Sequence, residues 1–438
     1  MDSRPSSDPR PGRRKAPVDL IVHSSSQLLT LSGGPQRGAE LGRLGLIPNG
    51  AVAVRGRQIV AVGPTTELLE GWDSTHKIDA SGHVVMPGFV DPHTHFVWAG
   101  DRAAEFERRL TGATYLEILA EGGGIMSTVR QTRATDLQSL IAQSRPRLQR
   151  MLQHGTTTAE VKTGYGLELE TELRMMEAIL TLDSQGPSSL TPTFLGAHAV
   201  PTDFSGRASA YVDLICDKML PRLKDWWGEK GAGRSLPFVD VFCEVGAFDL
   251  AQSRRILKRA AELGYPLKIH ADEFAGLGGT RMAVELGAVS ADHLVHTPPE
   301  DIAALGGSDT VAVALPATPF GLGEREYTPA RQILESNGLL ALASDLNPGT
   351  AWGESMQFVI ALACRMMKLT PAEAIAAATI NAAAAVGLSG QVGSLDPGKA
   401  ADLIVLDTPD YRHLAYRFGT NLVSQVIKGG RLVSAAGG

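Results

Sequence analysis

Two histidines separated by one residue, His93 and His95, give the sequence its clearest chemical signal. They follow the apolar segment 84–86 and the motif Pro-Gly-Phe-Val-Asp-Pro. In an extended backbone alternate side chains point to the same side, so both imidazoles can face one site. Imidazole is a common ligand of Zn, Fe, Cu and Ni. A His-x-His pattern alone also occurs by chance near turns, so a metal site requires further ligands later in the chain.

Later in the chain, polar residues of the metal-binding and acid–base types follow several apolar runs. They are Lys162 and Tyr165, His198, Glu244, His270 with Asp272 and Glu273, Asp292 with His293, and Asp345 with Asn347. Any one of them would pass as an ordinary polar residue at the end of a strand. Chance explains poorly why so many of the 11 histidines follow such runs. We interpret two others, His154 and His413, as structural.

A metal site can be assembled from His93, His95, His270 and Asp345. Three imidazoles and a carboxylate suit Zn or Fe and leave a position open for water. Such a water has its pKa drawn toward neutrality and becomes a nucleophile. Glu273, three residues after His270, and His293, after the next run, are placed to move protons and to stabilise a developing oxyanion. The pattern therefore predicts metal-dependent hydrolysis.

The elements that would hold these residues alternate between short apolar runs and helical segments, which predicts a parallel sheet and an α/β fold. Eight apolar runs are recognisable, at residues 85–90, 156–161, 193–195, 239–242, 267–269, 289–291, 311–315 and 339–343. Helices are expected at 115–120, 137–154, 170–182, 209–224, 250–263, 279–286, 329–336, 356–368 and 371–386. Eight strands close a (β/α)8 TIM-like barrel, in which chemistry lies at the C-terminal strand ends.

A doubly wound open sheet is the competing α/β fold. No Gly-x-Gly-x-x-Gly follows an early strand, and glycines 122–124 lack the Lys-Ser/Thr of a phosphate loop, so the barrel is favoured.

Both ends of the chain are rich in short β-type runs, which predicts a small β-sandwich domain formed from the two ends. In the first part, runs 51–54 and 59–62 flank Gly56 and are typical of a hairpin. The expected organisation is a disordered tail at 1–17, the sandwich at 18–85 and 391–438, and the barrel at 86–390. The tail is rich in Pro, Ser, Arg and Gly and has no apolar core of a signal peptide.

Composition excludes several classes of protein. Of the 438 residues, 43% are hydrophobic and 20% charged, which is typical of a globular protein with ample core. The net charge of -6 lacks the excess of positive charge that is typical of nucleic-acid-binding proteins. No apolar run reaches the roughly 18 residues of a membrane span. Cys216, Cys243 and Cys364 form no Cys-x-x-Cys pair, which suits a reducing compartment, and a cytoplasmic location is expected.

Two long motifs, at residues 87–95 and 393–407, resemble the amidohydrolase superfamily. Within it, four further segments are similar to the imidazolonepropionase family of histidine degradation. These segments are residues 95–102, 115–125, 160–167 and 195–201. The resemblance covers nearly everything after the basic tail.

This resemblance implies hydrolysis of the ring amide of 4-imidazolone-5-propanoate to N-formimidoyl-L-glutamate, with one Zn2+ or Fe3+ per subunit and a homodimer. The metal ligands of the family carry over onto His93, His95, His270 and Asp345. Its substrate contacts carry over onto Arg102, Tyr165, His198, Glu273, Asn347, Gly349 and Thr350. A propanoate needs a cationic fork, and Arg102 with the Tyr165 hydroxyl offers one; Tyr115 is a further candidate.

The catalytic roles are hypotheses at this point. Glu273 would orient substrate and shuttle a proton, Asp345 would take a proton from water, and His293 would stabilise the tetrahedral intermediate. Many superfamily members hold two metals bridged by a carboxylated lysine. The imidazolonepropionase pattern has a lysine at Lys162 without that role, so one metal is predicted.

Two alternatives remain open. Another cyclic-amide or cyclic-amidine amidohydrolase, such as a deaminase or a dihydroorotase-like enzyme, would share the metal site but would not need Arg102 and Tyr165. A non-catalytic binding or scaffold protein would be expected to have lost metal ligands, whereas all four are present here.

Overall fold

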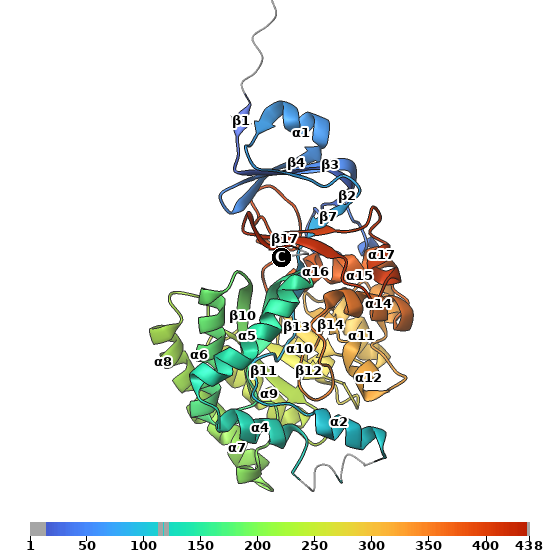
Figure 1. Ribbon diagram of the computed structural model, residues 1–438. Helices are drawn as coiled ribbons and strands as arrows, with labels where there is room; N and C mark the ends of the chain where they lie inside the picture. The colour runs from blue at the N-terminus through green and yellow to red at the C-terminus, as the bar shows by residue number, and fades with distance from the viewer. Residues whose placement is uncertain (1–14, 113–116, 118–121, 436–438) are drawn as a thin grey trace, which may run out of the picture.

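The structure of the protein is a computed structural model, and it describes residues 15–112, 117 and 122–435. Figure 1 shows its two parts: the blue N-terminal strands and the red strand β17 lie together at one end, and the green-to-orange barrel lies at the other. Within the described ranges, no helix is both long and apolar enough to cross a membrane.

Eight parallel strands form the barrel in sequence order, each bonded to the next. They are β8 (Phe89–Asp91), β9 (Thr156–Lys162), β10 (Ser189–Ala197), β11 (Phe238–Cys243), β12 (Lys268–Ala271), β13 (Ser290–His293), β14 (Val311–Ala314) and β15 (Leu339–Leu342). Parallel strands are covered on both faces, so they appear in the sequence as apolar runs. The predicted (β/α)8 barrel is confirmed.

The first and last strands meet just beyond their carboxyl ends. Thr94 and Leu346 form a parallel bridge there. The His95 amide donates to the Leu346 carbonyl at 2.9 Å, and the Asp345 amide donates to the His93 carbonyl at 3.1 Å. Barrel closure therefore brings the His93–His95 segment and Asp345 side by side, although about half the chain separates them.

Helices cover the barrel and fill the connections. They are α2 (Ala103–Leu110), α4 (Ile125–Arg133), α5 (Leu137–Gln153), α6 (Leu169–Gln185), α7 (Ala208–Leu214), α8 (Leu220–Lys230), α9 (Leu250–Glu262), α10 (Gly279–Glu285), α11 (Pro299–Gly306), α12 (Ala317–Leu322), α13 (Ala330–Glu335), α14 (Met356–Met366), α15 (Pro371–Ala377), α16 (Ile380–Ala385) and α17 (His413–Tyr416). A π-helical turn, Ile215–Met219, joins α7 to α8. The helix expected at 115–120 lies outside the described residues, apart from residue 117.

The alanine-rich helix expected at 371–386 is two helices, α15 and α16. Thr379 separates them with φ -131° and ψ -92°, and its hydroxyl donates to the Ile375 carbonyl at 2.7 Å. A side chain that bonds back to the preceding turn competes with the helical ladder. The break leaves the Ala378 carbonyl free to accept the Val90 amide of β8 at 3.1 Å.

The second sheet combines both chain ends in the order β18-β17-β16-β7-β2-β3-β4, with β6 paired to β2. Its strands are β2 (Leu20–Leu29), β3 (Leu46–Arg55), β4 (Gln58–Pro64), β6 (Lys77–Asp79), β7 (Val84–Pro87), β16 (Leu403–Leu406), β17 (Val423–Lys428) and β18 (Arg431–Ala435). The Ala401 amide, just before β16, donates to the Arg57 carbonyl at the β3–β4 turn at 2.8 Å, so the C-terminal part of the sheet contacts the N-terminal hairpin. Side chains from both ends share one apolar core, as in the predicted sandwich. The helix α1 (Thr65–Gly71) packs on β3 and β4.

The boundary between the two sheets differs from the sequence expectation. Residues 85–87 were assigned to the first barrel strand, but β7 pairs with β16 and β2 in the small sheet. Gly88 then separates β7 from β8, and a Cβ at that position would lie 2.4 Å from the Thr157 side chain. Only glycine allows β8 to turn into the barrel so close to β9.

The predicted disordered tail also needs one correction at its end. Ala16 and Pro17 form β1 (Ala16–Pro17), which pairs in parallel with β5 (Trp72–Asp73). Residues 1–14 lie outside the described residues.

Candidate metal centre

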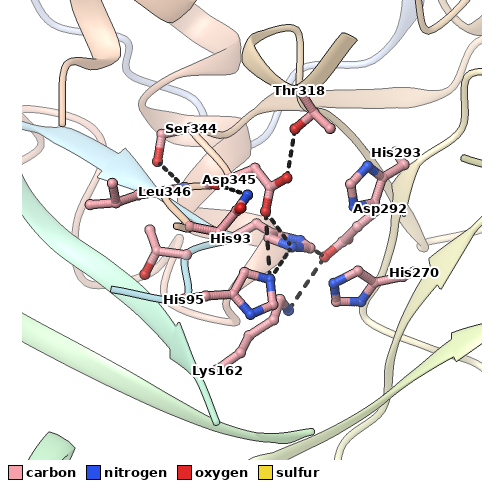
Figure 2. A network of polar contacts seen from close by, with 12 residues as sticks. His93, His95, Lys162, His270, Asp292, His293, Thr318, Ser344, Asp345 and Leu346 are labelled. Atoms are coloured by element: carbon pink, nitrogen blue, oxygen red, sulfur yellow. Dashed lines mark hydrogen bonds and ion pairs between the residues drawn. The ribbon is translucent and has the colours of Figure 1, made fainter. Parts of the chain in front are cut away.

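His93 and His95 turn toward each other at the carboxyl end of β8, as Figure 2 shows. Their Nε2 atoms are 3.3 Å apart, and both side chains are buried. Burial, followed by the charge of Lys162 for His93 and the proximity of His198 for His95, holds the pKa of each imidazole well below its ordinary value. Both rings are therefore neutral at pH 7, which is the form that binds a metal.

Asp345 completes this corner from the end of β15. Its Oδ1 lies 3.5 Å from the Nε2 atoms of both His93 and His95, and its Oδ2 accepts the Thr318 hydroxyl at 2.6 Å. Burial raises the pKa of the Asp345 carboxyl to about 6.

His270, at the end of β12, presents a ring nitrogen to the same space. Its Nδ1 donates to Asp240 at 3.1 Å, and its buried Nε2 has no hydrogen-bond partner among the described residues. The Nδ1 of His93 similarly donates to Asp292 at 2.6 Å. A carboxylate on Nδ1 fixes the tautomer of each ring and leaves the Nε2 lone pair for another partner.

These four side chains fit a bound cation. His93 and His95 point their Nε2 atoms at each other beside a carboxylate oxygen, and the His270 Nε2 has no hydrogen-bond partner among the described residues. The four side chains thus present electron-pair donors to one another without an electron-pair acceptor. Ligand atoms lie within 4.8 Å of one another in two overlapping sets, His93–His95–His270 and His93–His293–Asp345. Three imidazoles and a carboxylate are a donor set for Zn or Fe.

Comparison with known proteins identifies the family of this chain. A family model described as the amidohydrolase family matches residues 84–433. Curated imidazolonepropionases from Herpetosiphon aurantiacus and Chloroflexus aggregans are 53% and 52% identical to the chain. The matches cover 95% of this chain in both cases, and 97% and 99% of the relatives. The chain belongs to the imidazolonepropionase family of amidohydrolases.

Solved structures resemble this imidazolonepropionase-family chain in fold. An adenosine deaminase from Xanthomonas campestris with bound Zn has a TM-score of 0.69 at 18% identity, covering 96% of this chain and 93% of that chain. Guanine deaminase from E. coli has a TM-score of 0.71 at 16% identity, covering 95% of this chain and 98% of that chain. At these identities the likeness shows the fold alone.

Glu273 and His293 lie beside the four side chains of the imidazolonepropionase-family centre. The Glu273 Oε2 is 3.6 Å from the His293 Nδ1, which is too long for a hydrogen bond. The buried Nε2 of His293 has no partner among the described residues. Burial, then the charges of Asp345 and Glu244, raise the pKa of Glu273 well above its ordinary value. Glu273 is therefore a weaker acid than an exposed glutamate.

A cavity of about 490 Å³ leads from these two residues to the surface. Its walls come from the ends of β12 and β13, from α12 and from the segment after α12, and include Glu273, His293, Thr318, Leu322, Arg325 and Glu326. It gives a small molecule a route to the centre.

Three backbone positions at the site are strained. Asp272, His293 and Asp345 have φ values of 54°, 81° and 52°. Non-glycine residues seldom adopt positive φ, and such strain persists only where the surrounding structure imposes it. Each lies at or shortly after the carboxyl end of a barrel strand, where the chain turns.

On the other side of the histidines lie the residues predicted to bind substrate. The His198 ring stacks on that of His95 with centroids 5.1 Å apart, and the Tyr165 ring is 5.4 Å from His198. The Nδ1 of His198 bonds to the Gly164 carbonyl at 3.1 Å. These rings form one wall of the site.

Arg102 and the loop after β15 form a second wall. Arg102 Nε donates to Glu105 at 2.8 Å, and a Cβ at Gly349 would lie 2.4 Å from an Arg102 Nη atom. Asn347 holds the loop by accepting the amides of Gly349 and Thr350 at 2.8 and 2.9 Å. The loop therefore brings Gly349 against the Arg102 guanidinium. Tyr115 lies outside the described residues.

Sequence reasoning missed the buried charges below the site. Glu160, Lys162, Asp240, Lys268 and Asp292 all have no exposed surface. In the sequence, Lys162 and Asp292 stand out as polar residues at strand ends, and Lys162 also as a possible metal bridge, but neither is predicted to belong to a buried charge cluster. The available signal was ionisable residues inside apolar strands, because such residues are buried only when paired.

The loop that carries Tyr165 depends on a further carboxylate that sequence reasoning missed, Glu172 in α6. It accepts the amides of Gly164, Gly166 and Leu167 at 3.0, 2.8 and 2.8 Å. We expect Glu172→Gln to turn an amide N–H₂ toward these donors and lower the free energy of unfolding by about 1–3 kcal/mol. Urea denaturation measures the loss. Glu170→Gln, an exposed position on the same helix, should change it by less than about 0.5 kcal/mol, and equal effects would contradict the assigned role.

Proposed function

We propose that this chain is a metal-dependent hydrolase that converts 4-imidazolone-5-propanoate to N-formimidoyl-L-glutamate, a step of L-histidine degradation. The convergence of His93, His95 and Asp345 around one point carries the proposal, in a chain 53% identical to a curated imidazolonepropionase. We assign one Zn2+ or Fe3+ per subunit to His93, His95, His270 and Asp345. Such a cation lowers the pKa of a coordinated water toward neutrality.

The surroundings of Lys162 favour a single metal over two metals bridged by a carboxylated lysine. Its ammonium lies 2.7 Å from both Glu160 and Asp240. Burial alone would lower the pKa of Lys162, but Asp240, Glu160 and Asp292 together raise it above its ordinary value. A lysine must be neutral to become carboxylated, so this lysine is a poor candidate for a metal bridge. Elemental analysis should give about one metal per chain, and two would overturn this assignment.

Asp345 and Glu273 are proposed to move the protons. Asp345, with its raised pKa, is a stronger base than an exposed aspartate and accepts a proton from the attacking water. The water oxygen bonds to the ring carbonyl carbon to give a tetrahedral intermediate, and the C–N bond breaks when this intermediate collapses. Glu273, whose pKa is raised by burial, orients the ring and donates a proton to the departing nitrogen. His293 is neutral because burial lowers its pKa, and its N–H stabilises the oxygen of the tetrahedral intermediate.

The remaining residues are proposed to bind the substrate. Arg102 and Tyr165 take the propanoate, because a guanidinium and a hydroxyl give charge-assisted bonds to a carboxylate. His198 and the Asn347–Thr350 loop take the ring N–H and carbonyl groups.

The direct test mixes purified, metal-analysed protein with 4-imidazolone-5-propanoate and follows the loss of its ultraviolet absorbance. A panel of cyclic ureas, amidines and lactams is assayed in parallel. Turnover of imidazolone propanoate above the panel supports the proposal. Preference for another ring supports a different amidohydrolase activity, and absence of metal-dependent turnover supports a non-catalytic role.

Removing the Arg102 guanidinium should weaken recognition of the propanoate group without affecting hydrolysis of the ring. We expect Arg102→Met to raise KM for 4-imidazolone-5-propanoate by about 10- to 100-fold, since a hydrogen bond to a charged group contributes roughly 1.5–3 kcal/mol. An imidazolone without the propanoate is the control, because parent and variant should turn it over equally. A variant that loses both activities alike would remove Arg102 from propanoate recognition.

The homodimer and the cytoplasmic location stay predictions. Light scattering on the purified protein checks the first, and fractionation of source cells checks the second.

A further inference from the structure

Three carboxylates and two ammonium groups fill the centre of the barrel beneath the metal-binding side chains. They are Glu160 and Lys162 of β9, Asp240 of β11, Lys268 of β12 and Asp292 of β13, and none has exposed surface. Such a group is costly to bury unless every charge is paired and hydrogen-bonded. The cluster therefore needs a reason to exist inside an otherwise apolar barrel.

Lys162 joins the three carboxylates. Its Nζ is 2.7 Å from Glu160, 2.7 Å from Asp240 and 3.6 Å from Asp292. Lys268 differs, because its Nζ donates to the main-chain carbonyls of Pro92 and Ala385, and of the two aspartates only Asp292 lies within 4 Å of it, at 3.8 Å. Among the described residues, Lys162 is the cation that contacts both aspartates below the histidines within 4 Å.

The two aspartates each hold a different metal-binding histidine. Asp292 accepts from Nδ1 of His93 at 2.6 Å, and Asp240 accepts from Nδ1 of His270 at 3.1 Å. Asp240 also accepts the His270 main-chain amide at 3.2 Å. His93 and His270 come from strands that are not neighbours in the barrel, so their relative orientation depends on what links their two aspartates. Figure 2 shows Lys162 directed toward Asp292 below the imidazole rings.

We propose that Lys162 is a positioning residue of the metal centre, which holds Asp240 and Asp292 at one spacing and so directs the Nε2 atoms of His270 and His93 at the same point. Its ammonium compensates the charge of the two carboxylates and restrains them by hydrogen bonding and attraction. Without the Lys162 ammonium, each aspartate would rotate or bind water. The Nε2 atoms of the two rings would then no longer point at the same position. This inference rests on the proposed metal site and does not depend on the substrate.

The test measures Zn2+ affinity of the full chain without substrate, by competition with a chromophoric chelator. The main variant is Lys162→Met, which keeps the length of the side chain and removes the charge. Supporting groups of metal ligands typically change metal affinity by about 10- to 100-fold, so we expect the Kd for Zn2+ to rise by at least about tenfold.

Lys428→Met is the matched control. Lys428 is also buried, and its Nζ lies 2.6 Å from the buried Asp402, but this pair is in the small sheet. Both variants lose a buried ion pair, so both should have a lower Tm, and only Lys162→Met should bind Zn2+ more weakly. An unchanged Zn2+ affinity in Lys162→Met, or an equal loss in both, would overturn the proposal.

Asp292→Asn provides a second measurement if Lys162→Met does not fold. It keeps Lys162 and the ion pairs to Glu160 and Asp240, and should weaken Zn2+ binding by a similar factor. Unchanged Zn2+ affinity in this variant would also overturn the proposal. Where both single variants fold, the double variant should lose less than the product of the two, because the two residues act on one ring. Failure to hydrolyse imidazolone propanoate would refute the proposed reaction but would leave these metal affinities interpretable.

Discussion

The Glu273→Gln variant should lose turnover steeply while retaining its metal. We expect kcat to fall by about 10²- to 10⁴-fold, the range for a positioned acid–base group. The physical reason is that Glu273 is assigned the proton transfer to the departing nitrogen, and glutamine cannot transfer a proton in its place. Burial raises the pKa of this carboxyl, which favours its acid form. Steady-state kinetics on 4-imidazolone-5-propanoate and elemental analysis of the same preparation measure the two quantities.

Glu326→Gln is the matched control for this prediction. Glu326 lines the outer end of the same cavity, is well exposed, and pairs with His296 at 3.2 Å. Its replacement should leave kcat nearly unchanged, because an exposed ion pair contributes little. Unchanged turnover in Glu273→Gln would remove that residue from the mechanism, and metal loss in the same variant would instead make it part of the metal centre.

The barrel strands were predictable because parallel strands covered on both faces must be apolar throughout. The start of the barrel was not, since β7 (Val84–Pro87) is as apolar as β8 and runs almost directly into it. What separates them is pairing: β7 bonds to β16, more than 300 residues later in the chain. A local sequence pattern carries no information about a partner at that distance.

The break between α15 and α16 was hidden for a similar reason. Alanine, the best helix former, occupies most positions of this segment, and no glycine or proline follows Pro371 within it. The Ala378 carbonyl is instead taken by Val90 of β8. A tertiary hydrogen bond thus overrides the local preference.

Some residues of the candidate site were predictable from the sequence, and others depended on long-range pairing. His93, His95, His270 and Asp345 follow the ends of strands, where a barrel exposes polar residues, so their type and place predicted a metal site. Glu160 and Asp240 lie inside strands, and reading them as partners requires knowing that β9 and β11 face a common interior. Glu160 and Lys162 do alternate on β9, which places both side chains on one face. That spacing within an apolar run was a usable signal.

Replacing Asp345 with asparagine should abolish metal binding and yet stabilise the metal-free protein at neutral pH. The folded carboxyl has a pKa of about 6 against an ordinary value of 3.8. The folded state therefore holds this proton more tightly than the unfolded state, and stability falls as pH rises from about 4 to about 6. Above that window the buried charge costs the metal-free protein up to about 3 kcal/mol, since one pKa unit corresponds to about 1.4 kcal/mol.

Thermal unfolding at several pH values, with and without Zn2+, checks both parts of this prediction. For the parent, Zn2+ should raise Tm, because a ligand of the folded state stabilises it. Asp345→Asn should have a higher Tm than the metal-free parent at pH 7, a smaller difference at pH 4, and no response to Zn2+. Asp301→Asn is the control: this buried aspartate pairs with Arg281 at 2.7 Å away from the centre, so its variant should keep the Zn2+ response. A full Zn2+ response in Asp345→Asn would mean that the three histidines suffice to hold the ion, and the carboxylate would then serve only as the base.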